Sequence, residues 1–210
     1  MIFEQFSKIG VVPVLIPENF KEALNAAKIL FENDLPCLEV VFDAPAAEES
    51  IKIIGREFPD ILIGASRILT IEQADRAMNA GAKFIAASGL NPKIVQYCLD
   101  ESVPVIPGAL TPTELEQVLE LGLKVVRFFP AELSGGLGMI KAMAEAYSEL
   151  EFMPVGGINA KNLSGYLSYQ KVIACAGSWL IDKKLMAAEE WEKISALVKE
   201  AASIVKNIRS

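Results

Sequence analysis

The sequence predicts an α/β protein, a single (β/α)8 TIM barrel domain over residues 1–210 with a short N-terminal helix. Short β-branched runs alternate about eight times with longer segments that carry apolar residues at helical spacing. Eight such units in 210 residues suit a compact barrel better than a doubly wound sheet, which usually has fewer strands. The hydrophobic content of 52% is enough for a full core.

The expected strands are short runs rich in valine, isoleucine and phenylalanine, between polar or glycine-containing breaks. In chain order they cover residues 11–16, 37–42, 61–65, 83–87, 103–107, 124–129, 151–155 and 171–176.

The segments between these runs predict helices with recognisable ends. Thr70, Thr111 and Asn159 stand where N-caps belong, and Gly81 and Gly122 follow helices as C-cap glycines. The clearest helical segments cover residues 19–34, 47–58, 70–81, 91–102 and 111–122.

Composition excludes several classes of partner. A net charge of −7 and an isoelectric point near 4.8 argue against general binding to nucleic acid or an anionic membrane. An acidic chain can still contain a local basic pocket. The chain has no apolar run of membrane-spanning length and no secretory signal pattern, so we expect a cytoplasmic protein.

It has no histidine and no cluster of cysteines, so we expect no metal. Cys37, Cys98 and Cys175 predict reduced core thiols.

Charged residues occur where the predicted strands end, at the rim where barrel sites are built. Glu39 and Asp43 belong to the second strand and its end, Arg67 follows the third, and Arg127 interrupts the apolar sixth. Because side chains alternate along a strand, Glu39 and Arg127 are expected to meet inside the barrel. One interpretation is a set of mutually neutralising pairs, and the other is a site for a carboxylate or phosphate ligand.

Glycine-containing strand ends add a second signal. The stretches PVGGIN (154–159) and AGSW (176–179) follow the last two strands, where backbone N–H groups of such barrels often hold phosphate. In other proteins the dipeptides Gly-Gly and Gly-Ser commonly mark turns and bind nothing. The SGGLG run at 134–138 is open to two interpretations as well, a flexible loop or a backbone nest for an anion.

The motifs VVPVL, LEVVF, IGAS, PVIPGALTPTE, RFFPAE-x-x-GG, PVGGIN and GSW follow one another over residues 10–180. In this combination the chain resembles the 2-keto-3-deoxy-6-phosphogluconate / 2-keto-4-hydroxyglutarate (KDPG/KHG) aldolase family. The resemblance implies a homotrimeric class I aldolase, a lyase that cleaves a 2-keto-4-hydroxy acid to pyruvate and an aldehyde without metal or cofactor. Its partner would be a small anionic substrate or ligand, a 2-keto acid or sugar phosphate.

The resemblance also assigns site residues. Glu39 matches the glutamate that moves protons through a water, and Arg127 stands where relatives carry the lysine that forms the Schiff base. Substrate or phosphate contacts are implied for a further group of residues, namely Asp43, Arg67, Ser88, Pro107, Phe129, Gly156, Gly157, Gly177 and Ser178. Relatives often carry arginine at position 43, threonine at 67, an SPG around 88 and threonine at 155, so the differences gather at this rim.

Arginine at position 127 changes the chemistry that the site can perform. A Schiff base needs a neutral amine, whereas a guanidinium keeps its proton above pH ~12 and delocalises its lone pair. Lys141 is the least unfavourable of the other lysines, since it follows the sixth strand. Three functions remain open: a lyase that uses another lysine or arginine electrostatics, a binding protein that does not turn its ligand over, and an isomerase or epimerase with Glu39 as base.

Overall fold

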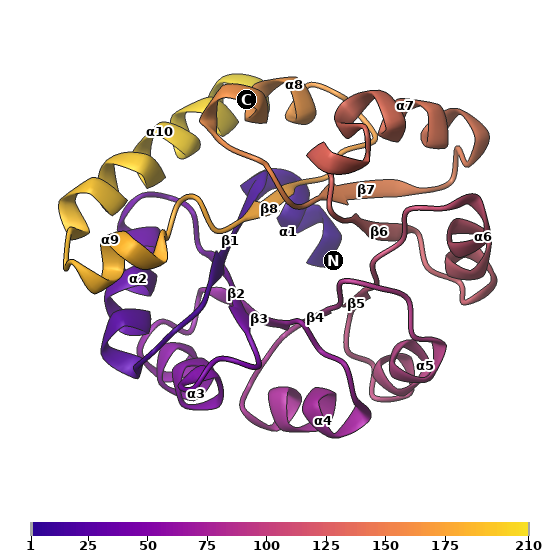
Figure 1. The fold of residues 1–210 in the computed structure, drawn as a ribbon. Coiled ribbons are helices and arrows are strands. Elements are labelled where there is room, and N and C mark those ends of the chain that lie inside the picture. Colours follow the sequence, from indigo (N-terminus) through magenta and orange to yellow (C-terminus); the bar gives the residue numbers. More distant parts are fainter. Residues whose placement is uncertain (1, 210) are drawn as a thin grey trace.

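The computed structural model describes residues 2–209 and shows parallel strands alternating with helices. Figure 1 shows the strands following one another around the centre of the molecule, with most helices on the outside. The strands are β1 Val11–Leu15, β2 Cys37–Val41, β3 Leu62–Ser66, β4 Ile85–Ala86, β5 Val105–Ile106, β6 Val125–Phe128, β7 Glu151–Pro154 and β8 Cys175–Gly177. The helices are α1 Ile2–Ile9, α2 Phe20–Glu32, α3 Ala47–Glu57, α4 Ile71–Asn79, α5 Pro92–Asp100, α6 Pro112–Glu120, η1 Glu132–Ser134, α7 Gly136–Ala146, α8 Ala160–Leu167, α9 Lys183–Ala187 and α10 Trp191–Arg209.

The strands pair in parallel throughout the described residues. Six form a sheet in the order β5-β4-β3-β2-β1-β8, and β6 pairs with β7. Isolated parallel bridges link the two groups, one between Gly108 and Arg127 and two more between the β7 and β8 regions. The predicted α/β class, with parallel strands joined by helices, is therefore confirmed.

Each strand and each of the five helices expected from the sequence overlaps its predicted range, but β4 and β5 cover only two residues each of the predicted 83–87 and 103–107. Thr70 accepts a hydrogen bond from the N–H of Gln73, and Thr111 forms a capping box with Glu114. Gly81 has the left-handed φ expected of a C-cap glycine, at +107°. The eighth strand is shorter than the predicted run 171–176, because the start of this run bridges β7 before β8 pairs with β1.

Side-chain alternation separates two layers of buried residues. Leu38 and Val40 of β2 belong to the large cluster under the helices, whereas Cys37 and Val41 belong to a second cluster, which we call the inner cluster. Glu39 shares the inner side with Cys37 and Val41. The buried members of the inner cluster are Phe6, Val12, Val14, Cys37, Val41, Phe84, Ile106, Val125, Met153, Val155, Ile173, Ala174 and Ala176.

Helix α1 covers the amino-terminal end of the inner cluster. Phe6 of α1 is fully buried and stacks edge-to-face on Phe84, with ring centroids 5.0 Å apart. A Cβ atom added to Gly64 of β3 would lie only 2.3 Å from the Phe84 ring. The absence of a side chain at Gly64 therefore makes room for the aromatic pair, which fills this end of the space between the strands.

The cysteines are core residues, as the sequence predicts. Cys37, Cys98 and Cys175 are buried and unpaired in disulfides. Burial raises the pKa of the Cys98 thiol to about 11. Burial together with the nearby Glu39 charge raises the pKa of Cys37 well above its usual value. No helix among residues 2–209 has the length and apolar character needed to cross a bilayer.

Gly64→Ala is expected to destabilise the protein, because the new methyl group overlaps a ring that Phe6 holds in place. Overpacking of this kind costs about 1–3 kcal/mol of unfolding free energy, measurable by urea denaturation. Gly55→Ala is the matched control: Gly55 lies inside α3 with no atom within 4 Å of the added Cβ, so the same change there should stabilise by up to about 1 kcal/mol. Equal effects at the two positions would contradict the packing argument.

Candidate active site

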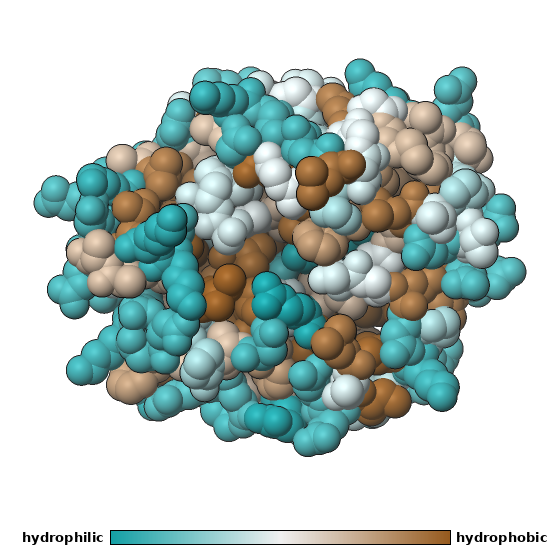
Figure 2. All heavy atoms as spheres, in the orientation of Figure 1, coloured by the Kyte–Doolittle hydropathy of each residue, from teal (hydrophilic) through white to brown (hydrophobic). Residues whose placement is uncertain are grey.

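A cavity of about 420 Å³ lies where the carboxyl ends of the strands meet. Figure 2 shows this face hollowed near its centre, where hydrophilic and hydrophobic residues lie side by side. The cavity is lined by Val14, Ile16, Val41, Ser66, Arg67, Ser88, Arg127, Phe129, Val155, Gly156, Gly157, Ile158, Gly177, Ser178, Trp179 and Asp182. Residues from at least six different strands and their loops therefore build one site.

Most of the residues that the sequence marks as candidates lie together at this cavity. Arg67, Ser88, Arg127, Phe129, Gly156, Gly157, Gly177 and Ser178 all line it. Glu39, Asp43 and Pro107 do not line it, and each contacts an arginine that does. Pro107 acts through its backbone, since its carbonyl accepts the N–H of Arg127 at 2.8 Å.

Glu39 and Arg127 form a buried ion pair at the inner end of the cavity. The Arg127 Nη1 donates to Glu39 Oε2 at 2.7 Å, which confirms that the two side chains meet. The Glu39 side chain is 0% exposed and that of Arg127 only 7%. Glu39 Oε1 and Arg127 Nε have no hydrogen-bond partner among the described residues. Arg127 thus stands between Glu39 and the cavity, and each charge compensates the other in a region from which water is largely excluded.

Asp43 and Arg67 form a second ion pair at the outer edge of the cavity. Arg67 Nη1 lies 3.3 and 3.2 Å from the two carboxylate oxygens of Asp43. Both side chains are about half exposed, at 49%, and pairs of this kind contribute about 0–1 kcal/mol to stability. Arg67 also has a left-handed backbone, with φ of +59°, which costs a side-chain-bearing residue about 1–3 kcal/mol. The ion pair does not offset the backbone strain.

The loops after β7 and β8 supply backbone donors to the cavity. Gly156 and Gly157 have φ of +98° and +82°, values that favour glycine. The N–H groups of Gly157, Ile158 and Ser178 donate to no acceptor within residues 2–209. All three residues line the cavity, and unpaired backbone N–H groups at such strand ends are of the kind that bind anions in other proteins.

Glu132 of η1 fixes the shape of this loop. Its N–H donates to the Gly156 carbonyl at 3.1 Å, and its carboxylate accepts a hydrogen bond from Tyr166. A Cβ atom on Gly157 would lie 2.6 Å from the Glu132 side chain. The glycine is therefore required both by its φ and by the close approach of Glu132. Gly136 of the SGGLG run opens helix α7, so part of that run is helical.

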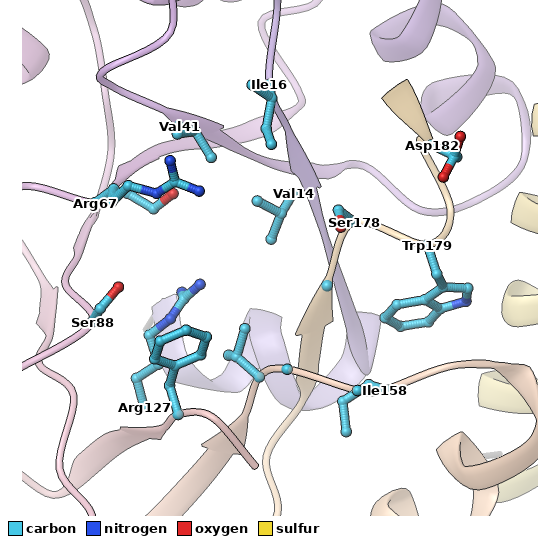
Figure 3. A pocket seen from close by; sticks show the side chains of 16 residues that line it. Val14, Ile16, Val41, Arg67, Ser88, Arg127, Ile158, Ser178, Trp179 and Asp182 are labelled. Carbon is cyan, nitrogen blue, oxygen red and sulfur yellow. The ribbon is translucent and has the colours of Figure 1, made fainter. Parts of the chain in front are cut away.

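Sequence reasoning missed Trp179 and Asp182 as cavity residues. Trp179 belongs to the GSW motif, and its ring lies 2.5 Å from where a Gly177 Cβ would be. Asp182 caps α9 by accepting the N–H groups of Lys184 and Leu185. Only the turn of the chain after β8 brings both side chains to the cavity. Figure 3 shows them across the cavity from Arg67.

Chemically, the cavity combines two guanidinium groups, three serine hydroxyls and free backbone N–H groups, with Asp182 as its only carboxylate. In Figure 3 the guanidinium groups of Arg67 and Arg127 point into the same space. None of the lining residues is a lysine, and Lys141 instead places its Nζ over the Tyr169 ring at 5.7 Å. No group of three potential metal ligands occurs among residues 2–209. The fold and the site define an α/β protein of parallel strands with a cavity at their carboxyl ends that is rich in hydrogen-bond donors and contains two arginines.

Comparison with known proteins identifies the family. The profile of the family described as KDPG and KHG aldolase matches residues 2–197. A 2-dehydro-3-deoxy-phosphogluconate aldolase of Treponema pallidum is 41% identical over 204 residues, covering 97% of both chains. A protein of the same description from Haemophilus influenzae is 41% identical over 205 residues, covering 98% of this chain and 97% of its own. The chain belongs to the KDPG/KHG aldolase family.

Solved structures agree with this assignment. The KDPG aldolase of Legionella pneumophila, determined with pyruvate as a covalent carbinolamine intermediate, has a TM-score of 0.90 and 32% identity, covering 93% of this chain and 95% of its own. The aldolase of Zymomonas mobilis ZM4, determined with 3-phosphoglycerate, has a TM-score of 0.88 and 32% identity, covering 96% and 95%.

The Glu39–Arg127 pair predicts a strong non-additive effect on stability. Glu39→Leu or Arg127→Met alone leaves one buried charge without a partner, and each should cost about 3–5 kcal/mol of unfolding free energy. The double variant should be more stable than either single variant, because no unpaired charge remains. Denaturant titration of the four proteins measures the coupling.

Glu48→Gln is the control for this cycle, since the partly exposed Glu48 pairs with Arg76 at 2.9 Å and Lys52 at 2.8 Å. It should cost less than about 1 kcal/mol. Additive effects of the two single variants would show that Glu39 and Arg127 do not depend on each other.

Proposed function

We propose that this protein binds a small phosphorylated 2-keto acid in the cavity and does not form a Schiff base with it. The observation that carries the proposal is the buried Arg127–Glu39 pair, at 2.7 Å, at the position where the family resemblance implies a lysine. Arginine keeps a positive charge at this place and therefore the attraction for an anion. It cannot supply the neutral amine on which an imine forms.

The opposite side of the cavity supports phosphate binding. The free N–H groups of Gly157, Ile158 and Ser178 offer several donors to one anion without the desolvation cost of a charged side chain. A cavity of about 420 Å³ is in the range of small-molecule sites. Phe129, Trp179 and the aliphatic lining residues would cover the carbon chain of the ligand.

Lyase activity is the second candidate function, and family membership favours it. Without an imine, the cleavage would need Arg127 to stabilise the enolate that forms as the aldehyde leaves. The geometry gives less support to Glu39 as a proton-transferring base, in a lyase or in an isomerase. Its carboxylate is 0% exposed, does not line the cavity and already accepts a hydrogen bond from Arg127.

For the whole protein we propose one closed (β/α)8 barrel domain with the short helix α1 at its amino-terminal end. The three isolated bridges between the two groups of strands support closure. We further propose a cytoplasmic homotrimer that needs no metal or cofactor and binds neither nucleic acid nor membrane. Contact between copies would cover exposed apolar side chains such as Leu133, which is 90% exposed, and Leu69, which is 65% exposed.

Borohydride reduction tests the absence of an imine. The wild-type protein incubated with pyruvate and sodium borohydride should show no covalent adduct by intact mass spectrometry. Arg127→Lys restores an amine next to Glu39 and should give a single adduct, which peptide mapping places on residue 127. A wild-type adduct on any lysine would contradict the proposal, and the same incubation without borohydride controls for non-covalent binding.

Phosphate binding should depend on the glycine loop. Gly157→Ala is expected to reduce affinity for glycerol 3-phosphate by at least about tenfold, because φ of +82° and the contact with Glu132 force the loop to move. Isothermal titration measures the affinity. Gly165→Ala is the matched control in nearby α8, since its added Cβ meets no atom within 4 Å, and it should leave affinity unchanged. Equal binding by both variants would place the phosphate elsewhere.

A further inference from the structure

Two successive peptide groups in the loop after β7 are held from outside the cavity. The carbonyl of Gly156 accepts the N–H of Glu132 at 3.1 Å. The carbonyl of Gly157 accepts two side-chain amides, the Nδ2 groups of Asn159 and Asn162, each at 3.0 Å. Gly156 and Gly157 line the cavity, whereas the three residues that hold their carbonyls do not. Both carbonyls are therefore turned away from the space that a ligand would fill.

The direction of a carbonyl sets the direction of the N–H group in the same peptide. Both peptides here are trans, and in a trans peptide the two groups point in opposite directions. The N–H of Gly157 is opposed to the Gly156 carbonyl, and the N–H of Ile158 is opposed to the Gly157 carbonyl. Both N–H groups therefore point toward the cavity, and neither has an acceptor within residues 2–209. Figure 3 shows Ile158 on the same side of the cavity as Ser178.

The two glycines make this support from outside necessary. Gly156 and Gly157 have φ of +98° and +82°, and residues without a Cβ atom also adopt the conformations in which these peptides are reversed. A reversed peptide between Gly157 and Ile158 would present a carbonyl oxygen to the cavity, and this oxygen would repel an anion. The two amide donors on the Gly157 carbonyl favour one orientation over the other.

Asparagine suits this role because its side chain contains both an acceptor and a donor. Asn159 Oδ1 caps α8 by accepting the N–H of Lys161 at 3.0 Å, and Asn162 Oδ1 accepts the N–H of Asn159 at 2.9 Å. Because a backbone donor engages each of these oxygens, each Nδ2 group has to face the Gly157 carbonyl. The same two side chains thus form the capping box of α8 and orient the loop before it.

We propose that Asn159 and Asn162 are positioning residues that aim the N–H of Ile158 at a bound anion. They act through the Gly157 carbonyl and do not contact the ligand. The inference rests on the proposed function, because it concerns the loop to which that function assigns the phosphate. Loss of both amides leaves every group that contacts the phosphate in place. It weakens binding because only a fraction of the molecules then has the loop in the competent orientation.

Affinity measurements on two matched double variants test the inference. Asn159→Ala/Asn162→Ala removes both amide donors together with the capping box of α8, and it should weaken glycerol 3-phosphate binding at least about fivefold by isothermal titration. Thr111→Ala/Glu114→Ala removes the capping box of α6, which lies outside the cavity lining, and should change the affinity by less than about twofold. Both should lower the melting temperature, because each helix loses its cap. The single variant Asn162→Ala should have an affinity between those of the wild type and its double variant.

Amide resonances of the nitrogen-15-labelled protein give a readout that a loss of stability alone would not change. In the ligand-free variant Asn159→Ala/Asn162→Ala, the resonance of Ile158 should broaden or move, because its peptide samples both orientations. The resonance of Ser178, which belongs to the loop after β8, should stay at its wild-type position. Saturation with glycerol 3-phosphate should return the Ile158 resonance toward that of the ligand-bound wild type, because the ligand selects the competent orientation.

Three results would overturn the inference. They are an unchanged affinity in Asn159→Ala/Asn162→Ala, an equal loss of affinity in both double variants, and an Ile158 resonance that is the same in the ligand-free wild type and its asparagine double variant. In each of the three, binding of glycerol 3-phosphate by the wild type leaves the proposed function standing. If the wild type binds neither glycerol 3-phosphate nor inorganic phosphate, the proposed function itself fails, and the inference fails with it.

Discussion

The ion pair between Glu39 and Arg127 is the interaction on which the rest of the site depends. Two charges lie among the apolar side chains of the inner cluster, and neither would be tolerated there alone. Their pairing joins β2 to β6, which belong to different groups of strands. It also fixes the inner end of the cavity as a positively charged surface, because Arg127 and not Glu39 faces the opening.

A second constraint comes from positions where only glycine fits. Gly64 makes room for the aromatic pair under α1, and Gly157 makes room for Glu132 beneath the loop after β7. The aromatic pair fills the amino-terminal end of the space between the strands. Gly157 belongs to a loop at the carboxyl-terminal end, where backbone N–H groups have no acceptor among the described residues. Packing fills one end of the space between the strands, and the cavity lies at the opposite end, where the sites of barrel proteins are built.

Membership of the aldolase family and the proposed absence of a Schiff base are compatible in this arrangement. The groups proposed to bind an anion are backbone N–H groups and arginines, and neither requires a lysine that forms a Schiff base. Arg127 supplies the positive charge that the buried Glu39 needs, and a guanidinium is not an amine on which an imine can form. Arg67, whose backbone is strained, adds a second guanidinium at the outer edge of the cavity. The cavity therefore has one positive charge at its inner end, from Arg127, and one at its outer edge.

The sequence by itself determined the order of strands and helices, the caps at Thr70 and Thr111, and the side of β2 on which Glu39 lies. These features depend on neighbours a few residues apart, through alternation, helical spacing and local hydrogen bonds. The tertiary structure alone decided that Asp43 pairs with Arg67 outside the cavity, that Arg127 covers Glu39, and that Trp179 and Asp182 reach the site. Those outcomes depend on strand register and on the path of loops, which bring together residues far apart in the chain, and no local pattern specifies them.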